Sequence, residues 1–168
     1  MLLWVLAFVA AGCGGNSDTK ANEAYANGVC TAIGTWTAEV KSLTTVPSGG
    51  VTKASLDAKL TQFETATKTM ISQLKAVPPP NTSEGQAAKT QVNQMASQVQ
   101  TTSAAVKSAF SALPANATVP EIVTSLSQLV PQFERLKSTA QSTIKTIQNA
   151  GGSLASAFKS ESACKQLS

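Results

Sequence analysis

Residues 121–148, EIVTSLSQLVPQFERLKSTAQSTIKTIQ, place apolar side chains three and four positions apart along their whole length. These side chains are Ile122, Leu126, Leu129, Phe133, Leu136, Ala140, Ile144 and Ile147. An α-helix brings residues at this spacing onto one face, whereas a half-buried strand would need strict alternation. The stretch therefore predicts a long amphipathic helix that packs against other helices. Pro131 lies inside the pattern, so we expect a kink there or a division into two helices.

Three earlier segments repeat this spacing, and no segment alternates convincingly over strand length. Their rows are Ala26, Val29, Ile33, Trp36, Val40 and Leu43; then Leu56, Leu60, Phe63, Thr67, Met70, Leu74 and Val77; then Ala88, Val92, Met95, Val99, Thr102, Val106, Phe110 and Leu113. Loops of about five residues between long helices favour antiparallel neighbours. We therefore predict an all-α fold, an up-down-up-down four-helix bundle.

Helix ends are marked between the four rows. Proline and glycine clusters that end a helix are 47–50 (PSGG), 78–80 (PPP) and Pro114. Ser83 with Gln86, and Thr118 with Glu121, have the spacing of a capping box, in which two side chains satisfy the first backbone amides of a helix. These signals predict that the third helix begins near Ser83 and the fourth near Val119.

The N-terminal segment has a different character. An apolar run from Leu2 to Ala11 is followed by Gly12, Cys13 and a polar stretch. This arrangement resembles the lipobox of bacterial lipoprotein signal peptides. The resemblance implies that residues 1–12 are removed, and that a diacylglycerol on the sulfur of Cys13 anchors the protein at the extracytoplasmic face of the cell membrane. Two acyl chains make a stable anchor, whereas ten apolar residues cover only about 15 Å of a ~30 Å hydrocarbon core.

Two positions depart from the lipoprotein pattern. Ala10 stands where the family usually has leucine, and no lysine or arginine precedes the apolar run. A true start upstream of Met1 is one explanation of the missing basic residue. The alternative interpretation of the whole segment is a buried N-terminal helix with a chance cysteine.

Two cysteines remain if Cys13 is lipidated. An even pair in an exported protein indicates one disulfide, between Cys30 and Cys164, and two unpaired buried thiols are the alternative. A straight fourth helix would carry Cys164 far beyond Cys30, because bridged α-carbons lie only about 4.4–6.8 Å apart. The chain must therefore turn back.

The obvious place for that turn is 149–152, NAGG. A short helix over about 153–160 would then descend beside the bundle with Leu154 and Phe158 facing inward. The domain organisation that follows is a signal peptide over 1–12, a flexible tether over 13–20, and one helical-bundle domain over 21–168.

The charge pattern excludes some partners. The net charge of +4 comes from 13 basic and 9 acidic residues spread singly along the chain. No run of lysine or arginine exists, so the sequence shows no basic stripe that would follow a phosphate backbone. We therefore expect no nucleic-acid partner.

Groups that carry chemistry are few. The chain has no histidine, so it lacks an imidazole base and a histidine metal ligand. Its carboxylates are isolated in sequence, and no serine lies in a Gly-x-Ser-x-Gly elbow. We expect no catalysis, no metal and no cofactor, and the sequence assigns no ligand-binding residue.

The whole chain resembles small secreted lipoproteins of high-GC Gram-positive bacteria that have no assigned activity. The resemblance lies in the lipobox, the Ala/Thr/Ser-rich helices and one cysteine near each end, and it transfers no binding residue. The first hypothesis is an interaction module that contacts an envelope protein or polymer. The second is a binding module for a small apolar or lipid ligand in a cavity between helices, suggested by the polar Thr67 and Thr102 within apolar rows. Aromatic residues after Cys13, other than Tyr25, fall at inward positions and are expected in the core.

Overall fold

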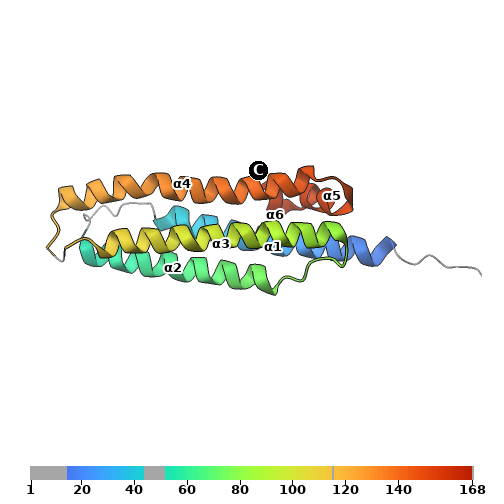
Figure 1. Cartoon of the computed structure of the whole chain (residues 1–168), viewed down its shortest axis with the longest axis horizontal. Helices are drawn as coiled ribbons and strands as arrows, with labels where there is room; N and C mark the ends of the chain where they lie inside the picture. Colours follow the sequence, from blue (N-terminus) through green and yellow to red (C-terminus); the bar gives the residue numbers. More distant parts are fainter. Residues whose placement is uncertain (1–14, 44–51, 115, 168) are drawn as a thin grey trace, which may run out of the picture.

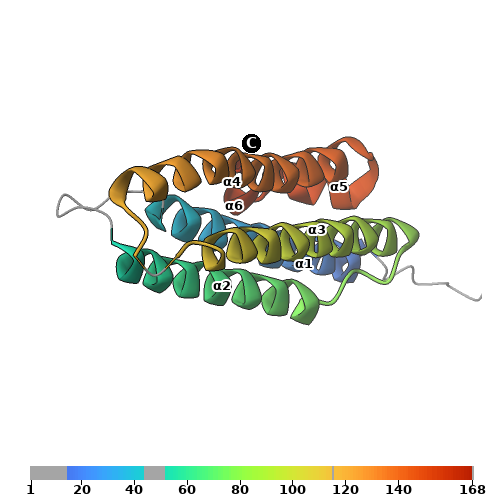
Figure 2. The same ribbon diagram turned by 60° about the vertical axis from the view of Figure 1, so that its left-hand side comes forward.

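The computed structural model describes residues 15–43, 52–114 and 116–167. Within these ranges the helices are α1 (Gly15–Leu43), α2 (Lys53–Ala76), α3 (Ser83–Ser111), α4 (Val119–Asn149), α5 (Gly152–Ser160) and α6 (Ser162–Lys165), and no strand is present. The four long helices lie side by side as an elongated bundle (Figure 1). Turning the molecule shows α5 folded back beside α4 (Figure 2). The predicted all-α bundle is confirmed.

The starts of α3 and α4 follow from local capping. Thr82, not Ser83, caps α3: its backbone is extended and its hydroxyl accepts a hydrogen bond from the Gly85 amide at 3.0 Å. The capping box predicted from Ser83 is therefore wrong by one residue, because Ser83 is already helical. At α4 the predicted pair is confirmed, since the Thr118 amide donates to the Glu121 carboxylate at 2.7 Å. The hydrogen bonds that the amide and hydroxyl of Thr118 donate to the Glu121 carboxylate lower the pKa of Glu121. The predicted 47–50 turn lies outside the described residues.

The end of α2 is held by a side chain from the next helix. The Lys89 ammonium on α3 donates hydrogen bonds to the carbonyl oxygens of Leu74, at 2.7 Å, and Val77, at 3.1 Å. Carbonyls at a helix C-terminus lack partners within the helix and carry partial negative charge. Lys89 therefore links α2 to α3 and, at the Leu74 carbonyl, replaces the amide donor that Pro78 cannot supply. Its desolvation lowers its pKa.

The fourth helix continues through Pro131. It runs from Val119 to Asn149 as one element, so of the two expected outcomes the division into two helices is wrong, and the kink stays a prediction. Proline cannot donate to the carbonyl of Ser127, four residues earlier. Ser127 is exposed, so water can take that hydrogen bond at little cost.

The chain reverses at two glycines. Gly151 and Gly152 have φ angles of 82° and 79°, a region that residues with a β-carbon rarely adopt. The Glu84 side chain lies against Gly152, so a β-carbon there would also collide. The turn sends α5 back along α1 and α4, and α6 completes the approach of Cys164 to Cys30. Their α-carbons are 5.0 Å apart and the disulfide is formed, as predicted.

Among the described side chains, most members of the predicted apolar rows lie in or against one hydrophobic core, with differences where α5 covers α1. Both inward residues of α5, Leu154 and Phe158, are buried as expected. Tyr25, expected outside the core, is also fully buried and meets the ring of Phe158 edge-on at 6.1 Å. Asn22 is buried as well, and its side-chain amide donates to the Ser153 hydroxyl at 2.9 Å.

The start of α1 also differs from expectation. Residues 15–20, predicted as part of a flexible tether, belong to this helix. Asp18 lies in its first turn, where a negative charge favours the positive end of the helix dipole. Contacts of Asn22 and Tyr25 with α5 then hold the following turns in place.

Candidate functional site: a polar groove between α2 and α3

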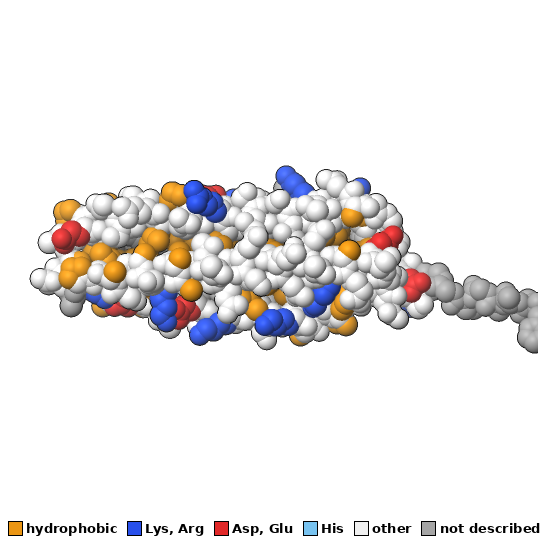
Figure 3. Space-filling model, in the orientation of Figure 1, with side chains coloured by type: hydrophobic (Ala, Val, Ile, Leu, Met, Phe, Trp, Pro, Cys, Tyr) orange, Lys and Arg blue, Asp and Glu red, His pale blue; other side chains and the backbone are white. Residues whose placement is uncertain are grey.

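A groove of about 490 Å³ runs along the surface between α2 and α3. Ten residues line it: Glu64, Thr67, Lys68, Ile71, Ser72 and Lys75 on α2, and Gln100, Ser103, Ala104 and Lys107 on α3. The view in Figure 3 shows lysine side chains along the lower edge of the molecule, on the side where α2 lies. The volume is within the range of small-ligand sites, and most of the lining side chains are polar or charged.

The antiparallel packing of α2 against α3 builds this groove. Residues 64, 68, 71 and 75 recur at helical spacing along one side of α2, and 100, 103, 104 and 107 do so on α3. The Lys107 ammonium lies 2.7 Å from the Glu64 carboxylate, which brings these two positions level. Lys75 follows Glu64 by eleven positions, and at about 1.5 Å per position this separation gives the groove a length of about 16 Å.

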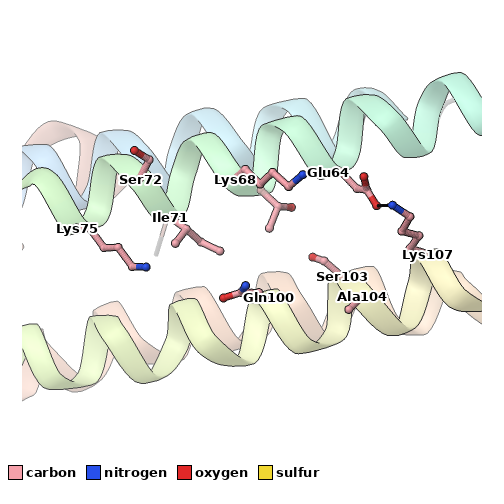
Figure 4. A pocket seen from close by; sticks show the side chains of 10 residues that line it. Glu64, Lys68, Ile71, Ser72, Lys75, Gln100, Ser103, Ala104 and Lys107 are labelled. Atoms are coloured by element: carbon pink, nitrogen blue, oxygen red, sulfur yellow. Dashed lines mark ion pairs between the residues drawn. The ribbon is translucent and has the colours of Figure 1, made fainter.

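The charges of the groove are unbalanced. Lys107 is paired with Glu64 across it. Lys68 and Lys75 make no ion pair with any residue that the structure describes. Figure 4 shows the Lys75 ammonium extending into the space between the helices, near the end opposite Lys107. Two uncompensated cations and one paired cation therefore face the same groove.

A buried hydroxyl lies at the base of the groove. Ser103 is only 6% exposed, and its hydroxyl has no hydrogen-bond partner. The close-up shows this oxygen pointing from α3 into the space between the helices (Figure 4). A buried hydroxyl without a partner is costly and rare, so it needs an explanation. A ligand oxygen that enters the groove would supply the missing partner.

The two threonines proposed from sequence differ in burial and in position relative to the groove. Thr67 is buried and lines the groove, but its hydroxyl already accepts a hydrogen bond from the Trp36 indole at 3.1 Å. Thr102 is half-buried, and its neighbour Ser103 takes the inward position. The structure thus brings Thr67 to a polar surface groove and does not place Thr102 in its lining.

The remaining predicted site residues are the three cysteines. Cys13 lies outside the described residues. Both Cys30 and Cys164 are fully buried in their disulfide, which leaves neither sulfur as a nucleophile. Across the described ranges, no group of three or more Asp, Glu, Cys or His side chains is arranged to hold a metal ion. The side chains of the groove can bind an anion through ammonium and hydroxyl groups.

Sequence reasoning missed the groove because its lysines are far apart in the chain. Lys68 and Lys75 are separated by 32 residues or more from Lys107, and no run of basic residues announces them. The available signal was the i, i+7 spacing of Lys68 and Lys75, which puts both on one side of α2.

Comparison of the chain with protein-family models, with curated proteins and with solved structures finds no match. Among the helices in the described part of the chain, none combines the length and apolarity required to cross a membrane.

Proposed function

We propose that this chain is a lipid-anchored protein of the extracytoplasmic face of the cell membrane, which binds an envelope protein or polymer and catalyses no reaction. The lipobox pattern ending at Cys13 supports the anchor. The observation that carries the binding role is the α2–α3 groove, with two uncompensated lysines above a buried hydroxyl that lacks a partner.

The position of the anchor suits such a role. Cys13 precedes the first helical residue, Gly15, by only two positions. A lipid on Cys13 would hold the bundle by the end at which α1 begins. The groove extends along the bundle axis from Lys75 toward Lys107, and therefore leads away from the membrane.

The alternative, an apolar ligand in a cavity between helices, has weaker support. The groove beside Thr67 is open to solvent and is not a cavity enclosed between helices, so it would bury little of an apolar molecule. The Thr67 hydroxyl is moreover occupied by Trp36.

The anchor is tested by replacing Cys13 with serine in the producing cell. The native protein should carry a diacylglyceryl mass on a chain that begins at Cys13, and should partition into detergent. Cys13→Ser should lack that mass and keep residues 1–12. Cys164→Ser is the matched control, because it removes the disulfide and should keep the lipid. A native chain that retains Met1 and carries no lipid would contradict the proposal.

The binding role is tested in intact cells with a photoreactive amino acid. Position 104 lies in the groove and is exposed, whereas Lys137 is an exposed position on α4. Irradiation should yield a defined adduct from position 104 and none from position 137. Equal labelling from both positions, or none from either, would remove the support for a groove-directed partner.

A further inference from the structure

We propose that the α2–α3 groove binds a linear phosphate polymer, with lysines neutralising successive phosphates and Ser103 hydrogen bonding to a phosphate oxygen. This inference rests on the proposed function, because it takes the groove as the binding surface and specifies the ligand. Its support comes from the spacing of the charges, the buried hydroxyl and the types of side chain in the lining.

The spacing of the lysines indicates an extended ligand. The backbone positions of Lys75 and Lys107 are separated by about 16 Å along the groove, with Lys68 between them. A single phosphate is too small to contact both ends. A chain that carries a phosphate at each repeat can meet all three ammonium groups at once, and so gains from each of them.

Ser103 provides a buried hydroxyl beneath the lysines. Its side chain is more than nine-tenths buried, and its hydroxyl donates to no atom of the described chain. The hydroxyl oxygen has less than 1 Å² of accessible surface, so a phosphate oxygen between the helices would accept that hydrogen bond once the side chains around Ser103 move apart. Hydrogen bonds to charged groups are stronger than those between neutral groups, so this contact favours an anion over a neutral sugar.

The kinds of side chain narrow the ligand class. All three cations are lysines, and the chain's only arginine, Arg135, lies on α4. The fork of an arginine matches carboxylate and phosphate alike, whereas a lysine ammonium binds phosphate as a point charge that sets no fixed orientation, as suits the successive phosphates of a polymer. The lining contains no aromatic side chain, so the bases of a single-stranded nucleic acid would find nothing to stack on. A phosphate polymer without bases fits best.

Glu64 opposes an anion, and so provides a sharp test. Its carboxylate holds Lys107 at 2.7 Å and repels phosphate at the same time. Replacing Glu64 with glutamine should release Lys107 to the ligand and remove the repulsion. The affinity should then rise about threefold, a gain that a purely structural role for this ion pair would not produce.

The probe is linear inorganic polyphosphate of several tens of units, titrated into the full-length protein. Orthophosphate, polygalacturonate and an RNA homopolymer serve as comparison ligands. Polyphosphate should bind most tightly, and its affinity should fall with salt with a log–log slope of about 1.4, by analogy with two phosphate contacts, at Lys68 and Lys75, to a single-stranded polyanion. Stronger binding of polygalacturonate or RNA, or no binding of polyphosphate, would overturn the proposal.

Variants of matched charge locate the site. Lys68→Glu with Lys75→Glu should weaken polyphosphate binding at least tenfold and lower the salt slope. Lys137→Glu with Lys145→Glu changes the net charge equally on exposed α4 positions and should alter affinity less than twofold. Equal losses in the two double variants would show that net charge alone attracts the polymer, and would overturn the proposal.

Ser103→Ala separates binding from folding. The substitution removes a hydroxyl that has no partner in the described structure, so the free energy of unfolding should not fall. The affinity should decrease at least about tenfold, as expected for one lost hydrogen bond to a charged group. Unchanged affinity would remove Ser103 from the site and contradict the proposal as stated.

The two proposals fail in different ways. If position 104 still forms an adduct in cells but purified protein ignores polyphosphate, the ligand class is wrong and the binding function stands. If polyphosphate binds in the groove but no adduct forms from position 104 in cells, the groove chemistry stands and the cellular function is wrong.

Discussion

The two halves of the bundle differ in how α1 and α4 are covered. In the half that holds the disulfide, α5 and α6 pack against α1, and Tyr25, Val29 and Phe158 are completely buried. In the other half, the beginning of α4 leaves Val119, Val123 and Val130 between 48% and 58% exposed. The α5–α6 segment is too short to reach them. A second buried face on α1 therefore exists only where the chain turns back.

Breaking the disulfide should have the largest effect on this difference. The bridge closes a loop with a sequence separation of 134, which corresponds to a stabilisation of about 5 kcal/mol in the chain-entropy model. Cys30→Ser with Cys164→Ser should lower the free energy of unfolding in denaturant by that order. Amide exchange should increase over 152–165 and stay unchanged over 119–130. A loss below about 1 kcal/mol would show that packing alone holds α5 and α6 in place.

Alkaline pH should weaken the disulfide half next. Burial raises the pKa of Tyr25 to about 12, from 10.0. In the unfolded chain this phenol ionises near pH 10.0, whereas in the folded protein it stays protonated until about pH 12. The free energy of unfolding is therefore unaffected by Tyr25 ionisation below pH 10 and falls as the pH rises toward 12. The loss should approach about 2–3 kcal/mol.

The chain has one tyrosine, so tyrosinate absorbance reports on Tyr25 directly. Tyr25→Phe should abolish the part of the pH dependence of the free energy of unfolding that comes from Tyr25, and should leave the part that comes from the lysines. It should also raise stability at neutral pH, because the phenol hydroxyl is buried without a hydrogen-bond partner. Tyrosinate formation near pH 10 in the folded protein would contradict the burial of this side chain.

A matched pair of valines gives the smallest effect and sharpens the comparison. Val29 is fully buried in the disulfide half, whereas Val123 is 48% exposed in the other. Val29→Thr should lower the free energy of unfolding by about 1–2 kcal/mol, because it buries a hydroxyl. Val123→Thr should change it by less than about 0.5 kcal/mol. Equal effects in thermal unfolding would mean that the two halves are covered alike.

Much of the fold could be predicted from local patterns. Apolar spacing identified the four long helices, and Thr118 with Glu121 marked the start of α4 correctly. The glycine pair and the position of Cys164 together required the reversed α5. Each of these signals acts within one helix or one turn, or through a covalent bond with strict geometry.

Features that depend on how two helices meet were missed. The burial of Tyr25 follows from contact with α5, 133 residues later in the chain at Phe158, and the first row alone gives no sign of it. The groove likewise depends on the register of α2 against α3, which brings Lys107 level with Glu64. A one-turn shift of either helix would disperse those side chains without changing any pattern in the sequence.

An NMR titration of the isotope-labelled protein with linear polyphosphate tests binding in the α2–α3 groove most directly, because it compares all surfaces in one experiment. Binding through the groove should shift and saturate the amide signals of residues 64–75 and 100–107, and leave those of 119–130 in place. Shifts concentrated around Val123, or spread evenly over every helix that carries lysine, would show that the α2–α3 groove is not the binding surface.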